Sequence, residues 1–135
     1  MSRPGASSSS LSVIAAVLVG VIAVVHLQQY IDFISEVPTI GVLFLLNAAG
    51  GAGLAFALIG RDDQLRRLAA VGSIALAAGS LISIVVALSS SLFGYSEPTL
   101  RLPILIAILA EVAVIPVLVG LLIGERTAAT AAPER

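Results

Sequence analysis

Three residue types are absent from the 135-residue chain, and three more occur only once, histidine among them. There is no cysteine, tryptophan or lysine, and histidine occurs once. Without cysteine the chain has no disulfide, no thiolate metal ligand and no cysteine nucleophile. One histidine excludes a multi-histidine metal site within a single chain. We therefore expect no metal and no cofactor, and no nucleophile–base pair supports an enzyme.

Charge is also scarce. Only 11% of the residues are charged and 59% are hydrophobic, whereas a typical globular domain has about 25% charged and 45–50% apolar residues. A domain of this size leaves much of its surface exposed, so it cannot bury such an excess of apolar side chains. The composition favours lipid as the solvent. The net charge of −1 gives no indication of a nucleic-acid partner.

Four apolar runs are long enough to cross a bilayer, which takes about 20 mostly apolar residues. They cover about 11–30, 38–60, 68–93 and 100–124. The short connections between them predict antiparallel neighbours, so the expected fold is an all-α, integral membrane, antiparallel four-helix bundle over 11–124. No small-residue cleavage motif follows the first run, which is expected to be a retained anchor. Residues 1–10 and 125–135 are expected to be a disordered leader and a flexible tail.

The arginines predict the orientation of the bundle. Six of the seven fall on the side that carries both termini and the middle connection, and only Arg101 falls on the other side. Because positive residues favour the cytoplasm, we expect a multi-pass protein of the inner (cytoplasmic) membrane with both termini in the cytoplasm. The middle connection, "RDDQLRR", is expected to meet anionic lipid. The six arginines are Arg3, Arg61, Arg66, Arg67, Arg126 and Arg135.

Small residues suggest which helix faces touch, since close approach of backbones drives helix association in lipid. Ala49 and Gly53 in the second run, and Ala75 and Gly79 in the third, are four residues apart and share a helix face. We expect the second and third helices to pack tightly along these faces. The first helix is expected to present Ala16, Val19, Gly20, Ala23, His26 and Tyr30 to the bundle.

One carboxylate interrupts the fourth run, in "ILAEVAVIP". Glu111 lies twelve residues after Thr99, or about 18 Å along a helix, which is near the middle of a hydrocarbon core of about 30 Å. The charged form is disfavoured there, so we expect a neutral, hydrogen-bonded carboxyl at rest. Pro116 is expected to kink the helix and free the carbonyl of Val112 beside Glu111. The acid is either structural or a proton or ligand site.

Further polar residues offer partners for this acid, because polar groups within a bilayer tend to face the bundle interior. Asn47, about 12 Å into the second run, is the favoured hydrogen-bond partner of Glu111. Ser80 is a second candidate at mid-depth in the third run, with Ser73 and Ser83 on the same helix. In the alternative, purely structural interpretation, these side chains only form hydrogen bonds that hold the helices together.

His26 and Tyr30 lie near the end of the first run, four residues apart and so on one helix face. Histidine titrates near physiological pH, so His26 is a candidate proton relay to Glu111 or a ligand-binding residue. The alternative is a histidine at the membrane interface that bonds to Tyr30 or water. Arg101 is expected to pair with an acid such as Glu97 or to reach lipid headgroups.

The segment "HLQQYIDFISEVPTIGVLFLLNAAGG" resembles a group of small four-span membrane proteins of high-GC actinobacteria, through its His and Tyr and through "PTIGVLFLLN". The resemblance covers about a fifth of the chain and implies the same four-helix topology, but no activity. The chain also shares four spans and an embedded acid with the small multidrug transporters. Their acid belongs in the first span, however, whereas Glu111 is in the fourth.

Three functions fit these observations. The first is a non-enzymatic structural or accessory subunit of a membrane complex, which needs only packing faces and buried polar contacts. The second is a small proton-linked transporter that uses Glu111, Asn47 and His26. The third is a binder of a lipophilic ligand such as a quinone or lipid, with His26 and Tyr30 at the mouth of a cavity. The expected partners are the lipid bilayer and either a larger membrane complex or further copies of the chain.

Overall fold

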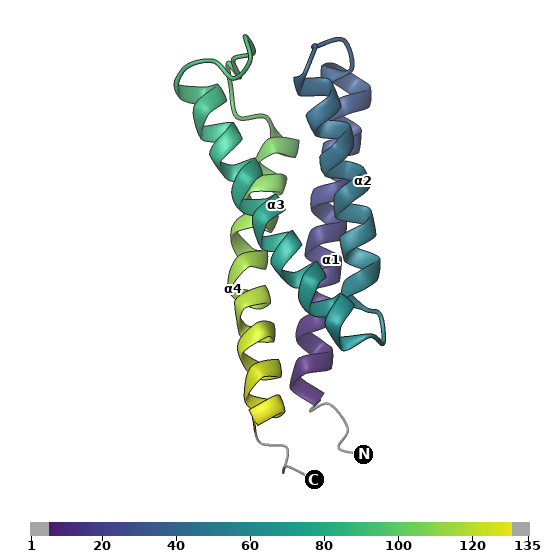
Figure 1. Cartoon of the computed structure of the whole chain (residues 1–135). Helices are drawn as coiled ribbons and strands as arrows, with labels where there is room; N and C mark the ends of the chain where they lie inside the picture. The colour runs from purple at the N-terminus through teal and green to yellow at the C-terminus, as the bar shows by residue number, and fades with distance from the viewer. Residues whose placement is uncertain (1–5, 131–135) are drawn as a thin grey trace.

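A computed structural model describes residues 6–130 and consists of four long helices that run alternately up and down (Figure 1). They are α1 (Ala6–Gln29), α2 (Ile40–Leu58), α3 (Asp63–Ser89) and α4 (Leu102–Thr130). A π-helical turn, η1 (Tyr30–Ile34), continues α1, and residues 6–130 contain no strand beyond one isolated bridge between Leu92 and Tyr95. The predicted all-α four-helix bundle is confirmed.

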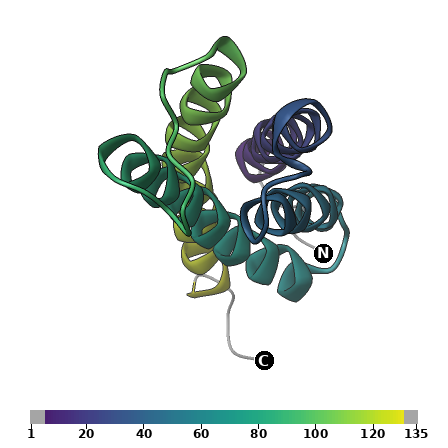
Figure 2. The same ribbon diagram turned by 90° about the horizontal axis from the view of Figure 1, so that it is seen from above.

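The bundle has two distinct ends. We call the end with the 35–39 and 90–101 connections the loop end, and the end with the 59–62 connection and both chain termini the terminal end (Figure 1). Each helix packs against two neighbours, in the order α1, α2, α3, α4 and back to α1. At the loop end the α3–α4 pair leans away from the α1–α2 pair (Figures 1 and 2).

The densest packing lies toward the terminal end, where all four helices contribute buried apolar side chains. Alanines on α3 allow close contact with the larger side chains of α1 and α4, as is usual where helices approach closely. This packed half of the bundle holds the four helices together at the terminal end, whereas the helix pairs separate at the loop end. The cluster contains Ala15, Val19, Ile22, Leu58, Ala69, Ala70, Ala77, Ala110, Val114, Leu118 and Leu121.

Both ends of the predicted membrane domain differ from expectation. Residues 6–10 of the expected leader are helical and continue into α1, and residues 125–130 of the expected tail continue α4. The tail is ordered because Glu125 is buried and accepts hydrogen bonds from Arg66 at 2.7 Å and Arg67 at 3.1 Å. These two arginines therefore join α3 to α4. Residues 1–5 and 131–135 lie outside the described residues.

Local chemistry explains two of the helix starts. The Asp62 carboxylate accepts the backbone N–H of Leu65 at 2.8 Å and caps α3, so α3 begins five residues before the predicted Leu68. At the start of α2, a Cβ on Gly41 would lie 2.7 Å from the carbonyl oxygen of Ile34. Only glycine permits this contact between η1 and α2, which sets their separation at the loop end.

The predicted small-residue contact between α2 and α3 is wrong. Ala49, Gly53, Ala75 and Gly79 are all exposed, and a Cβ on Gly53 or Gly79 would meet nothing within 4 Å. The tight small-residue contact is between α1 and α2 instead, where a Cβ on Gly51 would lie 3.1 Å from the Cβ of Ala23. The predicted inward face of α1 agrees better with the structure, since Val19, Ala23 and His26 are buried.

The outer faces of the helices are strongly apolar. Large hydrophobic side chains are exposed on all four helices, among them Val17 on α1, Phe56 on α2, Ile82 on α3 and Leu109 on α4. All four helices are long and apolar enough to cross a membrane. Exposed apolar surface on this scale is unusual for a monomer in water.

Candidate functional site

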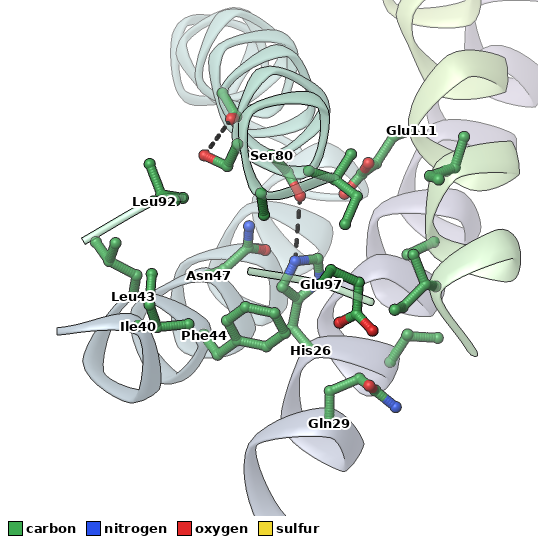
Figure 3. A pocket seen from close by; sticks show the side chains of 18 of the residues that line it. His26, Gln29, Ile40, Leu43, Phe44, Asn47, Ser80, Leu92, Glu97 and Glu111 are labelled. Carbon is green, nitrogen blue, oxygen red and sulfur yellow. Dashed lines mark hydrogen bonds between the residues drawn. The ribbon is translucent and has the colours of Figure 1, made fainter. Parts of the chain in front are cut away.

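A cavity of about 440 Å³ lies inside the loop-end half of the bundle. This volume is within the usual range of small-molecule sites, about 300–1,000 Å³. Its walls are mostly apolar, with a few polar side chains pointing inward (Figure 3). The polar lining residues are His26 and Gln29 from α1, Asn47 from α2, Ser80 and Ser83 from α3, Glu111 from α4, and Tyr95, Glu97 and Arg101 from the connection before α4.

The cavity reaches the protein surface between α2 and α3. Leu43 and Leu46 on α2, and Ala75 and Gly79 on α3, line it and are also exposed. The small residues that were expected to close this contact therefore border an opening. It exists because the helix pairs diverge toward the loop end (Figures 1 and 2).

His26 is buried and held by two hydrogen bonds. Nδ1 lies 2.9 Å from the carbonyl oxygen of Ile22, and Nε2 lies 3.2 Å from the Ser80 hydroxyl (Figure 3). A carbonyl can only accept, so Nδ1 carries the hydrogen and donates it. In the neutral ring Nε2 is then the acceptor, and Ser80 donates to it. The ring of Phe44 lies 5.0 Å away, centroid to centroid, and fixes the imidazole from the α2 side.

Glu111 is 1% exposed and lines the cavity from α4. Its Oε1 has no hydrogen-bond partner among the described residues. Ser80, which bonds to His26, lines the same cavity from α3. A buried polar atom without a partner costs free energy, so this acid is poorly explained as a contact that holds the helices together.

The expected bond between Asn47 and Glu111 is not formed. Both residues line the cavity, but Asn47 Oδ1 also lacks a partner among the described residues. Gln29, which the sequence reasoning missed, is in a similar state: it is 2% exposed and its Nε2 is unpartnered. Gln29 is three residues after His26 on the same helix face, and that spacing was the available signal.

Tyr30 does not join the site. It is absent from the cavity lining, and His26 bonds to Ile22 and Ser80 instead. Tyr30 begins η1, where the Ser35 N–H bonds to the Tyr30 carbonyl at 2.9 Å. The π turn begins at Tyr30, so it changes the helical register of the residues that follow rather than the spacing from His26.

Two further expected features lie outside the cavity. Pro116 and Val112 are exposed on α4 and line no part of it, so the expected free carbonyl is not brought to the cavity. Ser73 is buried with an unpartnered hydroxyl but is also absent from the lining, whereas Ser83 lines the cavity and donates to the Gly79 carbonyl at 2.8 Å.

The connection before α4 covers the loop end of the cavity. Glu97 is buried there and accepts hydrogen bonds from the Tyr95 hydroxyl at 2.6 Å and from Arg101 at 3.0 Å. Its backbone N–H bonds to the Ala87 carbonyl at 2.9 Å, which holds the cover to the end of α3. Burial, and then the bond to Glu97, raise the pKa of Tyr95 to about 12. The expected pairing of Arg101 with Glu97 is present.

The described residues contain no group of three or more metal-ligating side chains. The fold and site together define a four-helix bundle with an apolar cavity lined by His26, Ser80 and Glu111, in which His26 and Ser80 are hydrogen-bonded. The chain matches no known family model, no curated protein and no solved structure. Any function must therefore be argued from the cavity itself.

Proposed function

We propose that the chain is a multi-pass protein of the inner (cytoplasmic) membrane, with both termini in the cytoplasm. The apolar outer faces of the four helices support a lipid environment. The arginines support the orientation, since Arg61, Arg66, Arg67 and Arg126 lie toward the terminal end and positive residues favour the cytoplasm. The loop end, with its cavity, then faces the outer half of the bilayer.

We further propose that the cavity binds a small amphiphilic molecule, with an apolar body and a hydrogen-bonding head. One observation carries this proposal: three buried polar atoms, Gln29 Nε2, Asn47 Oδ1 and Glu111 Oε1, belong to residues that line an apolar cavity and have no partner among the described residues. Leaving such atoms unpaired costs about 1–3 kcal/mol each. A ligand head that pairs with them removes this cost.

The position of the opening indicates how such a molecule enters. Between α2 and α3 the opening is bordered by apolar and small residues, and in the proposed orientation it faces lipid. A ligand dissolved in the bilayer reaches the polar head-binding atoms without first crossing water. A lipid or quinone-like molecule has this character.

Two matched glycine substitutions test the binding site. Gly79 lines the opening and Gly53 is exposed elsewhere, and a Cβ at either position meets nothing within 4 Å. We expect Gly79→Leu to weaken binding of phenylbutanol at least tenfold, because its side chain occupies the opening. Gly53→Leu should bind as the wild type does. The measurement is calorimetric titration of the full chain in nanodiscs, corrected for partition into empty discs. Equal binding by both variants, or no binding by the wild type, would refute the proposal.

A second candidate function is a proton-linked carrier. The Ser80 bond to His26, together with the Glu111 carboxyl on the same cavity, favours it, since hydroxyl, imidazole and carboxyl groups around one cavity can exchange a proton. In a proteoliposome flux assay, Glu111→Gln should abolish pH-dependent transport because it removes the titrating proton. Unchanged flux in this variant would end the carrier hypothesis.

The prediction of a structural or accessory subunit remains a third proposal, supported by the packed terminal half. It requires a stable larger partner on purification from native membranes. It does not account for unpartnered polar atoms in an open cavity, so we rank it below ligand binding.

A further inference from the structure

Glu111 has no positively charged partner among the described residues. The ion pairs among the described residues join Arg66 to Asp63 and Glu125, Arg67 to Glu125, and Arg101 to Glu97. Every arginine in these pairs is engaged away from Glu111. A buried carboxylate without a counter-ion is strongly disfavoured, so Glu111 must either keep its proton or receive a cation from outside the chain.

The surroundings of Glu111 suit a cation that donates hydrogen bonds. Glu111 Oε1 and Asn47 Oδ1 are both acceptors, both unpartnered and both on residues lining the cavity. The Phe44 ring also lines it, and aromatic faces attract cations. A neutral head would satisfy the acceptors but would leave the charged form of Glu111 uncompensated. An ammonium head satisfies both requirements, although as a donor it does not pair with Gln29 Nε2, which is also a donor.

We propose that the ligand of this cavity is a lipophilic primary or secondary amine in its protonated form, which takes the place of the proton on Glu111 as it binds. This inference rests on the proposed ligand-binding function and specifies its substrate class. The exchange balances: one ammonium enters, the Glu111 O–H bond breaks, and one proton leaves. The net charge in the cavity does not change.

Glu111 is itself the source of that proton. The His26 nitrogens are engaged by the Ile22 carbonyl and by Ser80. A proton kept on the imidazole would place a second positive charge in the cavity that holds the ammonium. The displaced proton therefore leaves the cavity, which keeps the charge balance.

The other titratable groups of the cavity are already paired. The connection before α4 contributes Tyr95, Glu97 and Arg101, which are bonded to one another. From α1 the titratable lining residue is His26, and the lining residues of α2 and α3 include none. A proton released when an amine binds thus originates from Glu111.

The test compares three probes with one apolar body: phenylbutylamine, phenylbutanol and phenylbutyltrimethylammonium. The full chain in phosphatidylcholine nanodiscs is titrated calorimetrically between pH 6 and pH 8, in buffers of different ionisation heat, which counts the protons released. We expect about one proton per bound amine, and an affinity for the amine that rises by up to about tenfold per pH unit. At pH 8 the amine should bind at least tenfold more tightly than either other probe.

Two variants test whether proton release depends on Glu111 itself or on any carboxylate of the chain. Glu111→Gln should lose proton release and the pH dependence of amine binding, while its retained binding of phenylbutanol shows that the cavity is intact. Glu36→Gln makes the same chemical change at an exposed carboxylate of the loop end and should leave amine binding unchanged.

The possible failures are distinguishable. If phenylbutanol binds as tightly as the amine and no proton is released, the amine inference is overturned and the binding function stands. The amine inference is likewise overturned if Glu111→Gln binds the amine as the wild type does. If no probe binds, both the inference and the proposed function fail.

Discussion

Replacing Glu111 by leucine should make the bundle more stable while it removes ligand binding. Glu111 is fully buried, and its Oε1 is unpartnered among the described residues. A buried polar atom without a partner costs about 1–3 kcal/mol. Leucine has no such atom and is favourable at the centre of a membrane helix by about 0.3–0.6 kcal/mol.

The expected gain is about 1–3 kcal/mol in the free energy of unfolding. This corresponds to roughly a 5- to 150-fold shift in the folded-to-unfolded ratio, since 1.4 kcal/mol is a factor of ten. Glu111→Gln keeps a polar group in the same place and should change stability by less than about 1 kcal/mol. A residue retained at such a cost is expected where function requires it.

Reversible unfolding in mixed micelles, followed by circular dichroism, measures this difference. Val112→Leu is the matched control, because its side chain is next in sequence but exposed, and it should stay within about 0.5 kcal/mol of the wild type. A Glu111→Leu protein less stable than the wild type by more than about 1 kcal/mol would refute the reasoning. The acid would then be a satisfied structural contact.

Two predictions concern the ends of the bundle. Glu125→Ala removes the acceptor of Arg66 and Arg67. It should lower the free energy of unfolding by about 1–3 kcal/mol, between the values for exposed and buried ion pairs. Unchanged unfolding and unchanged hydrogen exchange over 125–130 would contradict this prediction. The folded pKa of Tyr95 is raised to about 12, so its stabilising contribution is complete below the unfolded value near 10 and is lost as the pH rises from 10 to 12. Tyr95→Phe should therefore lose less stability than the wild type over that interval in thermal unfolding, and identical pH profiles would disprove the raised pKa of Tyr95.

The number and position of the helices could be predicted from the sequence because they depend on local properties. A run of about 20 apolar residues forms one helix wherever it packs, and short connections make neighbours antiparallel. The ends were less predictable. Residues 125–130 look like a tail in the sequence, and they become part of α4 through the contact of Glu125 with Arg66 and Arg67, 58 or 59 residues away in the chain.

The candidate site was predictable in part. His26, Asn47, Ser80 and Glu111 stand out because they are polar within apolar helices, and the structure brings all four to one cavity. Their connections could not be predicted, since a hydrogen bond between helices depends on the rotation of each helix about its axis. The bond from His26 to Ser80, in place of Tyr30, follows from that rotation.

The sequence by itself determined that four apolar helices form an antiparallel bundle and that an acid lies deep within the fourth. Composition and run length are sufficient for this, because each helix satisfies its own backbone hydrogen bonds. Only the tertiary structure decided that α2 and α3 separate at the loop end, so that Ala75 and Gly79 border an opening rather than a contact. Close contacts at Gly51 with α1 and at Gly41 with η1 hold α2 against α1, while at the loop end the α3–α4 pair leans away from them. The tilt of whole helices depends on such contacts between helices, which no local pattern of residues specifies.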